Sequence, residues 1–496
     1  MRFGLYTLTL FLSTISLASA VERPNVLLVV TDEHNFRTLG CYREQLSADQ
    51  AEMWGPGSIV ETPNIDRIAD EGVLFTRAYA TAPVCTPSRA AMFTGRFPHN
   101  TGAPQNNMPL RTEVPTLAKI LSSNGYRSSY IGKWHLGGPG KPEWAPNVDG
   151  GFENTAFMFN RGHWKKLALT DGVPSVGSRN NKGAPDYGVE EADDKTFTTD
   201  YLTDRAIESI RHPSDEPFLL VVSYPDPHGP NTVRAPYDSM YDHLRFLPPR
   251  TYQQKDSPKP NWLGGGPNHP VFRGEQMSKY FGMVKCIDDN FGRLLESLKQ
   301  QGQLDSTLIV FTSDHGDLCY EHDRLNKGNP YEGSARVPLL IRYPDRITAK
   351  TVYEGPAGTV DLTPTILTLA GISTDAAFEG RSLTSRIAKN ARSTINLPPE
   401  VTFLRNAGTS PSWLAVVDGR YKLIVSTKDR PWLFDLQEDP DELLNYYGRP
   451  GTEDIVKQLG TRLMDYAQRT QDPFATEDKI ANSIERCVVP LIANPR

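Results

Sequence analysis

Short apolar runs without alternating polar positions recur along the chain, at residues 25–31, 218–222 and 308–311. Such runs are typical of strands that are buried on both faces of a sheet. Segments with helical periodicity are found between or beside these runs, at residues 116–123, 199–211 and 276–301. Strands that alternate with helices predict an α/β fold with a mostly parallel central sheet flanked by helices.

The pattern changes near residue 392. Short apolar stretches separated by turn residues follow there, at 401–404, 413–417, 421–425 and 432–435, and a helical pattern covers 453–468. This texture predicts a small antiparallel sheet with one helix. We therefore expect a catalytic domain at 21–390 and a smaller C-terminal α+β subdomain at 391–496.

The first twenty residues have the features of a secretory signal peptide. Arg2 precedes an apolar run over 3–17, and Ala18-Ser19-Ala20 offers small residues for cleavage. The apolar run is too short to cross a membrane. We expect cleavage after Ala20 and a secreted or periplasmic protein. No later stretch reaches about 20 apolar residues, so the mature chain is predicted to have no membrane span.

Composition limits the remaining classes. The net charge of -6 over 496 residues argues against a globally basic surface that would bind nucleic acid. The five cysteines are dispersed and form no C-x-x-C pair. A disulfide scaffold or a zinc ribbon is therefore not expected, although a single bridge stays open.

Cys85 opens the run C-T-P-S-R, which has the features of a helix start. Pro87 suits the first turn of a helix, and Gly95 would end the helix ten residues after Cys85. Cys85 would then lie where backbone N–H groups favour an anion. The alternative is a small buried thiol before an ordinary helix, and a short motif alone does not exclude it.

Titratable residues follow the predicted strands. Asp32 and Glu33 come directly after the first strand, His228 follows the second, and Asp314 and His315 follow the third. Ligands of open α/β sheets bind at the carboxyl ends of the strands. The sequence therefore predicts one site at this edge of the sheet.

Several long motifs together resemble the formylglycine-dependent sulfatases of the alkaline-phosphatase-like superfamily. Besides the cysteine run, G-Y-R-S-S-Y-I-G-K-W-H-L-G at 125–137 looks like the second signature of that family. T-S-D-H-G at 312–316 with Lys327-Gly328 looks like the third block, and its D-H-G form is closest to glycan and iduronate sulfatases. The resemblance covers most of the chain and implies a sulfuric ester hydrolase.

The resemblance implies that one divalent cation is bound by Asp32, Glu33, Asp314, His315 and an oxygen on modified Cys85. Calcium is the usual ion of the family, and carboxylates suit a hard cation. Glu33 stands where many members have Asp or Gln, and His315 is a softer ligand than oxygen. Manganese or zinc therefore stays open.

The resemblance also assigns catalytic roles. Cys85 would be oxidised to formylglycine, and Arg89 and His135 would hold its hydroxyls. Lys133 and Lys327 would hold the sulfate, and a lysine suits a compact oxyanion. His228 would protonate the leaving oxygen, which a histidine can do near neutral pH.

The function expected is removal of O-sulfate from a sulfated polysaccharide or oligosaccharide, after maturation by a formylglycine-generating enzyme. Two alternatives stay open. Phosphonate monoester and phosphodiester hydrolases of the same superfamily share most of these residues. A non-catalytic protein that binds sulfated glycans would keep the fold without the chemistry.

Overall fold

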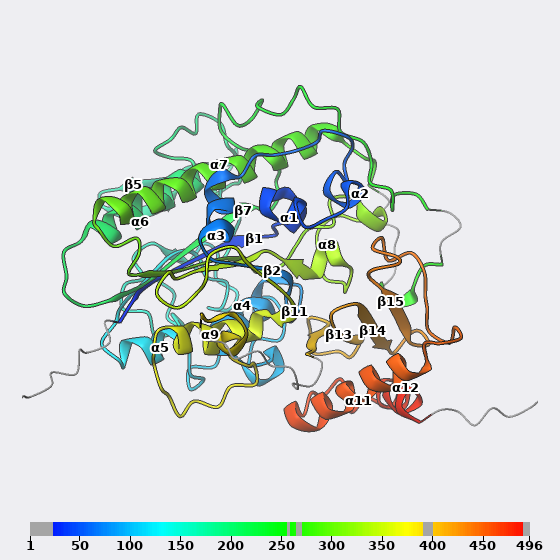
Figure 1. Ribbon diagram of the computed structural model, residues 1–496. Helices are drawn as coiled ribbons and strands as arrows, with labels where there is room; N and C mark the ends of the chain where they lie inside the picture. Colours follow the sequence, from blue (N-terminus) through cyan, green and yellow to red (C-terminus); the bar gives the residue numbers. More distant parts are fainter. Residues whose placement is uncertain (1–22, 255–257, 264–269, 390–399, 490–496) are drawn as a thin grey trace, which may run out of the picture.

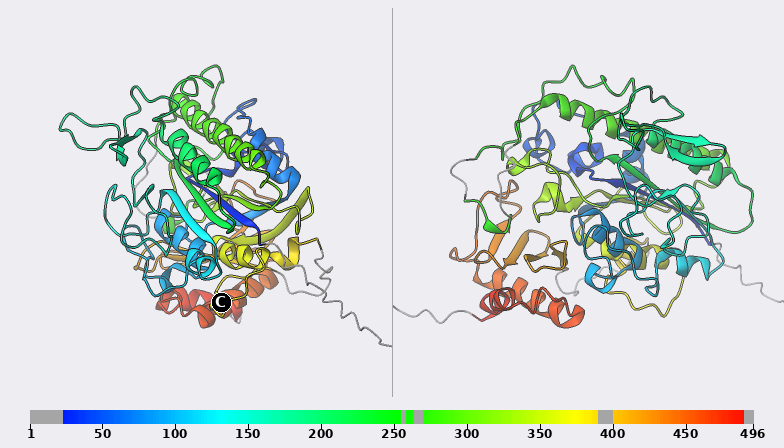
Figure 2. Two further views of the ribbon diagram at one scale, coloured as in Figure 1. Left: turned by 90° about the vertical axis from the view of Figure 1, so that its left-hand side faces the viewer. Right: turned by 180° about the vertical axis from the view of Figure 1, so that it is seen from behind.

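The computed structural model describes residues 23–254, 258–263, 270–389 and 400–489, so the predicted signal peptide lies outside the described residues. A nine-stranded sheet with helices on both faces forms the larger part (Figures 1 and 2). Its strands, in spatial order, are β11 (Thr351–Gly358), β2 (Val73–Tyr79), β10 (Leu339–Arg342), β8 (Thr307–Ser313), β1 (Asn25–Asp32), β7 (Phe218–Pro227), β3 (Arg127–Lys133) and β4 (Met158–Phe159), with β9 (Arg336–Val337) beside β2.

Most neighbouring strands of the sheet run parallel. β1 pairs in parallel with β7 and β8, β3 pairs so with β7 and β4, and β11 pairs so with β2. The exceptions are β10, which is antiparallel to both β8 and β2, and β9, which is antiparallel to β2. The predicted α/β class with a mostly parallel sheet is confirmed.

The two faces of the sheet carry separate cores. Val26, Leu28 and Val30 of β1 pack with one core, and Leu27 and Val29 pack with the other. Because both faces are buried, the strand reads as a continuous apolar run. The first core is covered by α4 (Cys85–Thr94), α5 (Leu117–Ser122) and α9 (Leu362–Leu369), and the second by α3 (Pro63–Glu71), α6 (Thr198–Arg211) and α7 (Gly274–Gln300).

A second, smaller sheet follows near the C-terminus. Its strands are β12 (Thr402–Arg405), β13 (Trp413–Val417), β14 (Tyr421–Ser426) and β15 (Trp432–Asp435), all antiparallel. Helices α11 (Glu453–Thr470) and α12 (Asp478–Val488) cover one face, and the sequence analysis had predicted only the first of them. The other face packs against the larger part through Tyr79, Leu318 and Tyr331.

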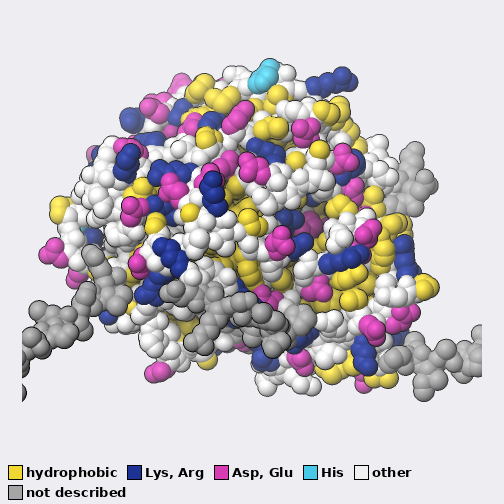
Figure 3. Space-filling view, viewed as in Figure 1, with side chains coloured by type: hydrophobic (Ala, Val, Ile, Leu, Met, Phe, Trp, Pro, Cys, Tyr) yellow, Lys and Arg dark blue, Asp and Glu magenta, His cyan; other side chains and the backbone are white. Residues whose placement is uncertain are grey.

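The remaining α-helices and strands are short: α1 (Gly40–Arg43), α2 (Ala48–Ala51), α8 (Glu332–Ala335), α10 (Thr384–Ile387), β5 (Leu167–Thr170) and β6 (Val173–Val176). All five cysteines are buried and free. No helix in the described part of the chain is long and apolar enough to cross a membrane. On the face that Figure 3 shows, basic and acidic side chains are interspersed rather than gathered by sign.

Candidate active site

Four neighbouring parallel strands end at the site. β8, β1, β7 and β3 lie side by side in that order. β8 is followed by Asp314 and His315, β1 ends at Asp32, β7 is followed by His228, and β3 ends at Lys133. Asp32 and Asp314, which are 282 positions apart in sequence, thus meet because parallel strands present their carboxyl ends at one edge.

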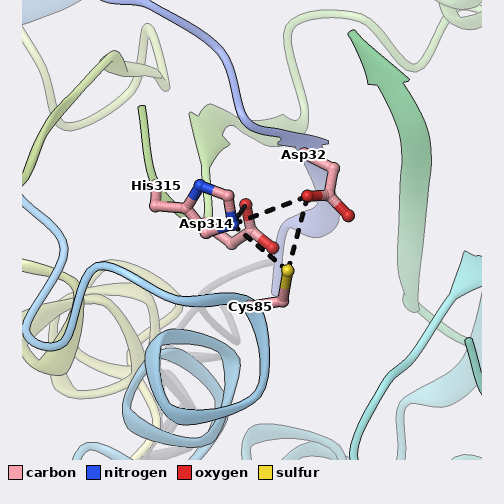
Figure 4. Close-up of side chains that lie close together, drawn as sticks. All are labelled: Asp32, Cys85, Asp314 and His315. Atoms are coloured by element: carbon pink, nitrogen blue, oxygen red, sulfur yellow. Dashed lines mark hydrogen bonds and ion pairs between the residues drawn. The ribbon is translucent and has the colours of Figure 1, made fainter. Parts of the chain in front are cut away.

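Four of the five predicted metal ligands converge (Figure 4). His315 Nε2 lies 3.2 Å from Cys85 Sγ, 3.6 Å from Asp32 Oδ1 and 3.4 Å from Asp314 Oδ1. One ligand atom from each of the four residues lies within 4.8 Å of the others. Both carboxylates and the imidazole are fully buried, and the thiol is 2% exposed. The four residues could hold a cation, and their ligand roles stay a prediction.

Glu33 lies apart from that group. Its backbone has a φ of 67°. Its Oε2 lies 2.9 Å from His228 Nε2 and 3.0 Å from Lys327 Nζ. Burial alone would raise the pKa of Glu33, but the charges of His228 and Lys327 lower it to about 2. Oε1 is buried and has no hydrogen-bond partner among the described residues.

Arg89 and Lys133 neutralise the buried carboxylates. Arg89 Nε donates to Asp314 Oδ2 at 2.8 Å, and its Nη1 donates to the carbonyl of Lys133 at 2.8 Å. Lys133 Nζ donates to Asp32 Oδ2 and lies 3.6 Å from Cys85 Sγ. Burial would raise the pKa of Asp32, yet Lys133, His228 and Arg89 hold it well below the usual value.

Cys85 is the first residue of α4, as the sequence predicted. The helix ends at Thr94, followed by Gly95 at φ 64°, where an added Cβ would lie 2.7 Å from Phe378. Burial and Asp32 would raise the pKa of the Cys85 thiol, but Lys133, Lys327 and His315 lower it. A side chain at this position is therefore held among cationic groups.

His135 lies beside the start of α4, because its carbonyl accepts from Thr86 Oγ1 at 2.8 Å. Both ring nitrogens are buried and have no hydrogen-bond partner among the described residues. Burial, with Lys133 and Arg89 nearby, holds the pKa of His135 well below its usual value. A neutral imidazole with two free nitrogens can accept or pass a proton.

Lys327 and His228 form the other side of the site. Lys327 Nζ lies 2.6 Å from His228 Nε2 and 3.0 Å from Glu33 Oε2. Burial would lower the pKa of Lys327, but Glu33 and Cys85 raise it, so the ammonium is retained. His228 Nδ1 donates to the carbonyl of Gly229 at 2.8 Å, which directs Nε2 into the site.

The sequence analysis missed His163, which the structure places in the site. His163 Nε2 lies 2.9 Å from Lys133 Nζ, and its ring stacks on that of His228 with 3.4 Å between centroids. Burial, Lys133 and His228 hold the pKa of His163 well below its usual value. The only signal in the sequence was a mixed aromatic and basic segment at 157–166, which does not single out one residue.

The residues present fit a divalent cation. Two carboxylates, one imidazole and the side chain of residue 85 form a donor set of the kind that hard or borderline cations take. Burial would lower the pKa of His315, but the negative charges of Asp314 and Cys85 raise it to about 9. The free Glu33 Oε1 points to the same conclusion.

Comparisons with known proteins identify related families and structures. A model of the Sulfatase family matches residues 24–372, and a model of the N-sulphoglucosamine sulphohydrolase C-terminal region matches 320–469. An N-acetylglucosamine-6-O-sulfatase of Bacteroides thetaiotaomicron is 26% identical and covers 95% of this chain and 92% of its own.

Two solved structures share the fold. One is a structure in complex with its substrate D-glucosamine-2-N,6-O-disulfate, with a TM-score of 0.71, 23% identity and coverage of 92% of this chain and 100% of its own. The other is a phosphonate monoester hydrolase of Silicibacter pomeroyi, with a TM-score of 0.68, 24% identity and coverage of 92% and 97%.

Proposed function

Since the chain belongs to the sulfatase family, we propose that this sulfuric ester hydrolase removes O-sulfate from a sulfated polysaccharide or its oligosaccharides. The observation that carries the proposal is the convergence of four strand ends on Cys85 at the start of a buried helix. The related N-acetylglucosamine-6-O-sulfatase supports a sugar substrate.

Cys85 would act after oxidation to formylglycine. That conversion removes two electrons from Cβ and expels sulfur as sulfide, so it needs an oxidant that a maturation enzyme supplies. The hydrated aldehyde would supply one hydroxyl that attacks sulfur and a second whose deprotonation re-forms the carbonyl and releases sulfate. Asp32, Asp314, His315 and the free oxygen of Glu33 would hold a divalent cation, proposed to be calcium, which supplies Lewis acidity.

The other residues stabilise charge and move protons. Lys133 Nζ lies 3.6 Å from Cys85 Sγ, and Lys327 Nζ lies 3.0 Å from Glu33 Oε2; both lysines would neutralise the oxygens of the sulfate. Arg89 would hold the carboxylates in place. His228 Nε2 would donate its proton to the ester oxygen as the S–O bond breaks, so that the sugar leaves as an alcohol. His135, with two free nitrogens, would take the proton of the second hydroxyl.

The remaining parts of the proposal concern the whole chain. Residues 1–20 would direct the protein to the periplasm or the exterior and would be removed there. Residues 21–390 would form the catalytic domain, and 391–496 a C-terminal subdomain that supports it. The segment 390–399 between them lies outside the described residues.

The test is an assay of the matured protein on defined sulfated saccharides, with matched phosphate and phosphonate monoesters beside them. Mass spectrometry of the peptide that contains Cys85 reports the extent of conversion. We expect turnover of at least one sugar sulfate at a rate that follows the converted fraction. Preference for a phosphonate or phosphodiester would favour the alternative hydrolase, and binding of sulfated glycan without turnover in converted protein would favour a binding protein.

A further inference from the structure

Two histidine–lysine pairs lie side by side in the site. His228 Nε2 lies 2.6 Å from Lys327 Nζ, and His163 Nε2 lies 2.9 Å from Lys133 Nζ. The two imidazole rings are stacked, with centroids 3.4 Å apart and an interplanar angle of 10°. Their side chains are 15% and 19% exposed, whereas Lys133 is fully buried. The ring pair therefore lies between the buried charges and solvent.

The position of His163 is built into its loop. Gly162 has a φ of 122°, and a Cβ there would lie 2.4 Å from the Trp164 ring, so the turn requires glycine. Trp164 is buried and anchors the loop after the turn. Between these two residues, the His163 side chain is directed toward Lys133.

The loop of His163 is also bonded to the loop of His228. Buried Lys165 donates from Nζ to Asp226 Oδ1 at 2.5 Å and to the carbonyl of His228 at 3.0 Å. Asp226 Oδ2 in turn accepts from Thr199 Oγ1 at 2.6 Å. The two loops cannot separate without breaking a buried ion pair, so the stacked rings keep their relative position.

We propose that His163 is a positioning residue that aligns the sulfate-binding Lys133 and the proton donor His228, a role that rests on the proposed function. Its Nε2 accepts from the Lys133 ammonium and directs that charge toward Cys85. Its ring covers one face of His228 and fixes the plane from which Nε2 reaches the leaving oxygen. One side chain thus orients groups that act on the transferred sulfate and on the departing alcohol.

The two contacts can be separated by substitution. His163→Phe keeps a ring that stacks on His228 but has no acceptor for Lys133. His163→Gln keeps an acceptor oxygen but has no ring. The same change at an exposed position, His243→Phe, is the control for the substitution itself.

Steady-state kcat/KM is measured on a sugar sulfate and on a nitrophenyl sulfate. We expect His163→Phe to lose about tenfold or more on both esters, because the sulfate is common to them. We expect His163→Gln to lose at least about tenfold more on the sugar sulfate, because only a poor leaving group needs protonation. Equal loss ratios for the two variants, or activity of both near that of His243→Phe, would overturn the inference.

A binding measurement separates this inference from the proposed reaction. The affinity of the matured protein for inorganic sulfate, measured by calorimetry, is expected to fall in His163→Phe and to change less in His163→Gln. If the parent hydrolysed neither ester but sulfate binding followed this pattern, the reaction would be wrong and the positioning of Lys133 would stand. Unchanged sulfate affinity in both variants, or none in the parent, would overturn the inference itself.

Discussion

Two clusters of buried charges in this protein have similar composition and opposite character. At the strand ends, Glu33 Oε1 and both ring nitrogens of His135 have no hydrogen-bond partner among the described residues. Behind them, Lys422 Nζ donates to Glu332 Oε1 at 2.7 Å, to Glu442 Oε1 at 2.8 Å and to a backbone carbonyl at 2.7 Å. The second carboxyl oxygen of Glu442 accepts from the backbone N–H of Glu332 at 2.6 Å.

The two clusters differ in whether their buried polar atoms have hydrogen-bond partners, not in the charges that they contain. A buried polar atom without a partner costs free energy, and a ligand that meets it is one physical explanation for its presence. The Lys422 cluster joins the small sheet to α8 and leaves no oxygen of Glu442 free. We infer that the first cluster binds and reacts and that the second holds the two parts of the chain together.

The largest effect is expected from Cys85→Ala, which should abolish activity and leave the stability of the protein unchanged. Formylglycine cannot form there, so kcat for sulfate esters should fall by about 10⁵-fold or more, of the order seen when a nucleophile is removed. Thermal unfolding should change little, because only one sulfur atom is lost. Cys286→Ala, which removes a buried thiol outside the site, should keep activity. Turnover by Cys85→Ala would refute the mechanism.

The next largest effect is expected from a change at the proposed cation site, which should lower bound metal and activity together. Asp314→Asn removes one charge from the ligand group and the partner of Arg89 Nε. Bound metal, measured by mass spectrometry of the ions, and kcat/KM should fall together by about 10²-fold or more, since an altered metal shell has effects of this size. The exposed Asp375→Asn is the control. Normal turnover by extensively chelated protein would show that no cation is needed.

These two predictions rest on residues that sequence reasoning identified, and the reason is physical. Strands buried on both faces read as apolar runs, and parallel strands bring their carboxyl ends to one edge, so Asp32 and Asp314 could be placed together from the sequence. The direction of β10 could not, because apolar residues fit either orientation. The small sheet was predicted from its turns, and its second covering helix was missed.

The placement of two site residues depends on backbone geometry. Glu33 follows Asp32 directly, and its backbone is left-handed; its Oε2 lies 3.0 Å from Lys327 Nζ, and its Oε1 has no partner among the described residues. His163 enters the site through a loop whose course depends on Gly162 and on the ion pair of Lys165. Neither backbone conformation produces a periodic pattern of apolar and polar residues, so a single sequence does not predict it.

A substitution in the Lys422 cluster is expected to lower the stability of the protein and to leave its activity intact. Lys422→Met leaves Glu442 buried without its cation and leaves Glu332 paired with Arg336, at 3.4 Å. Breaking a buried ion pair typically costs about 3–5 kcal/mol of unfolding free energy. Urea unfolding should report this loss, and the folded fraction should keep its activity. Lys428→Met, at an exposed position in the turn between β14 and β15, is the control. If Lys422→Met lowered the unfolding free energy by less than Lys428→Met does, the cluster would not stabilise the protein.

Within the site, His228→Ala should separate proton transfer from sulfate binding. The kcat/KM on a sugar sulfate should fall about 10²-fold or more beyond the loss on a nitrophenyl sulfate, because a nitrophenol leaves without protonation. Lys133→Ala and Lys327→Ala should instead damage both esters comparably. Equal losses of His228→Ala on the two esters would remove His228 from the acid role.

The smallest effect concerns His34, a satisfied histidine next to the unsatisfied cluster. Its ring nitrogens lie 3.2 Å from Thr31 Oγ1 and 2.9 Å from Thr38 Oγ1. Burial lowers the pKa of His34 to about 3, against an unfolded value near 6.5. The folded state therefore holds this ring neutral, and the stability it contributes is complete above pH 6.5 and declines as the pH falls toward 3.

Between pH 7 and pH 5 the unfolded chain takes up a proton at this position and the folded chain does not, which costs about 2 kcal/mol of unfolding free energy. His34→Gln can keep hydrogen bonds to the threonines but cannot titrate. The difference in unfolding free energy between pH 7 and pH 5, measured by urea unfolding, should therefore be about 2 kcal/mol smaller in the variant than in the parent. Identical pH dependence in the two proteins would show that His34 takes up its proton in the folded state, and that a hydrogen-bonded histidine at this edge is not held neutral by burial.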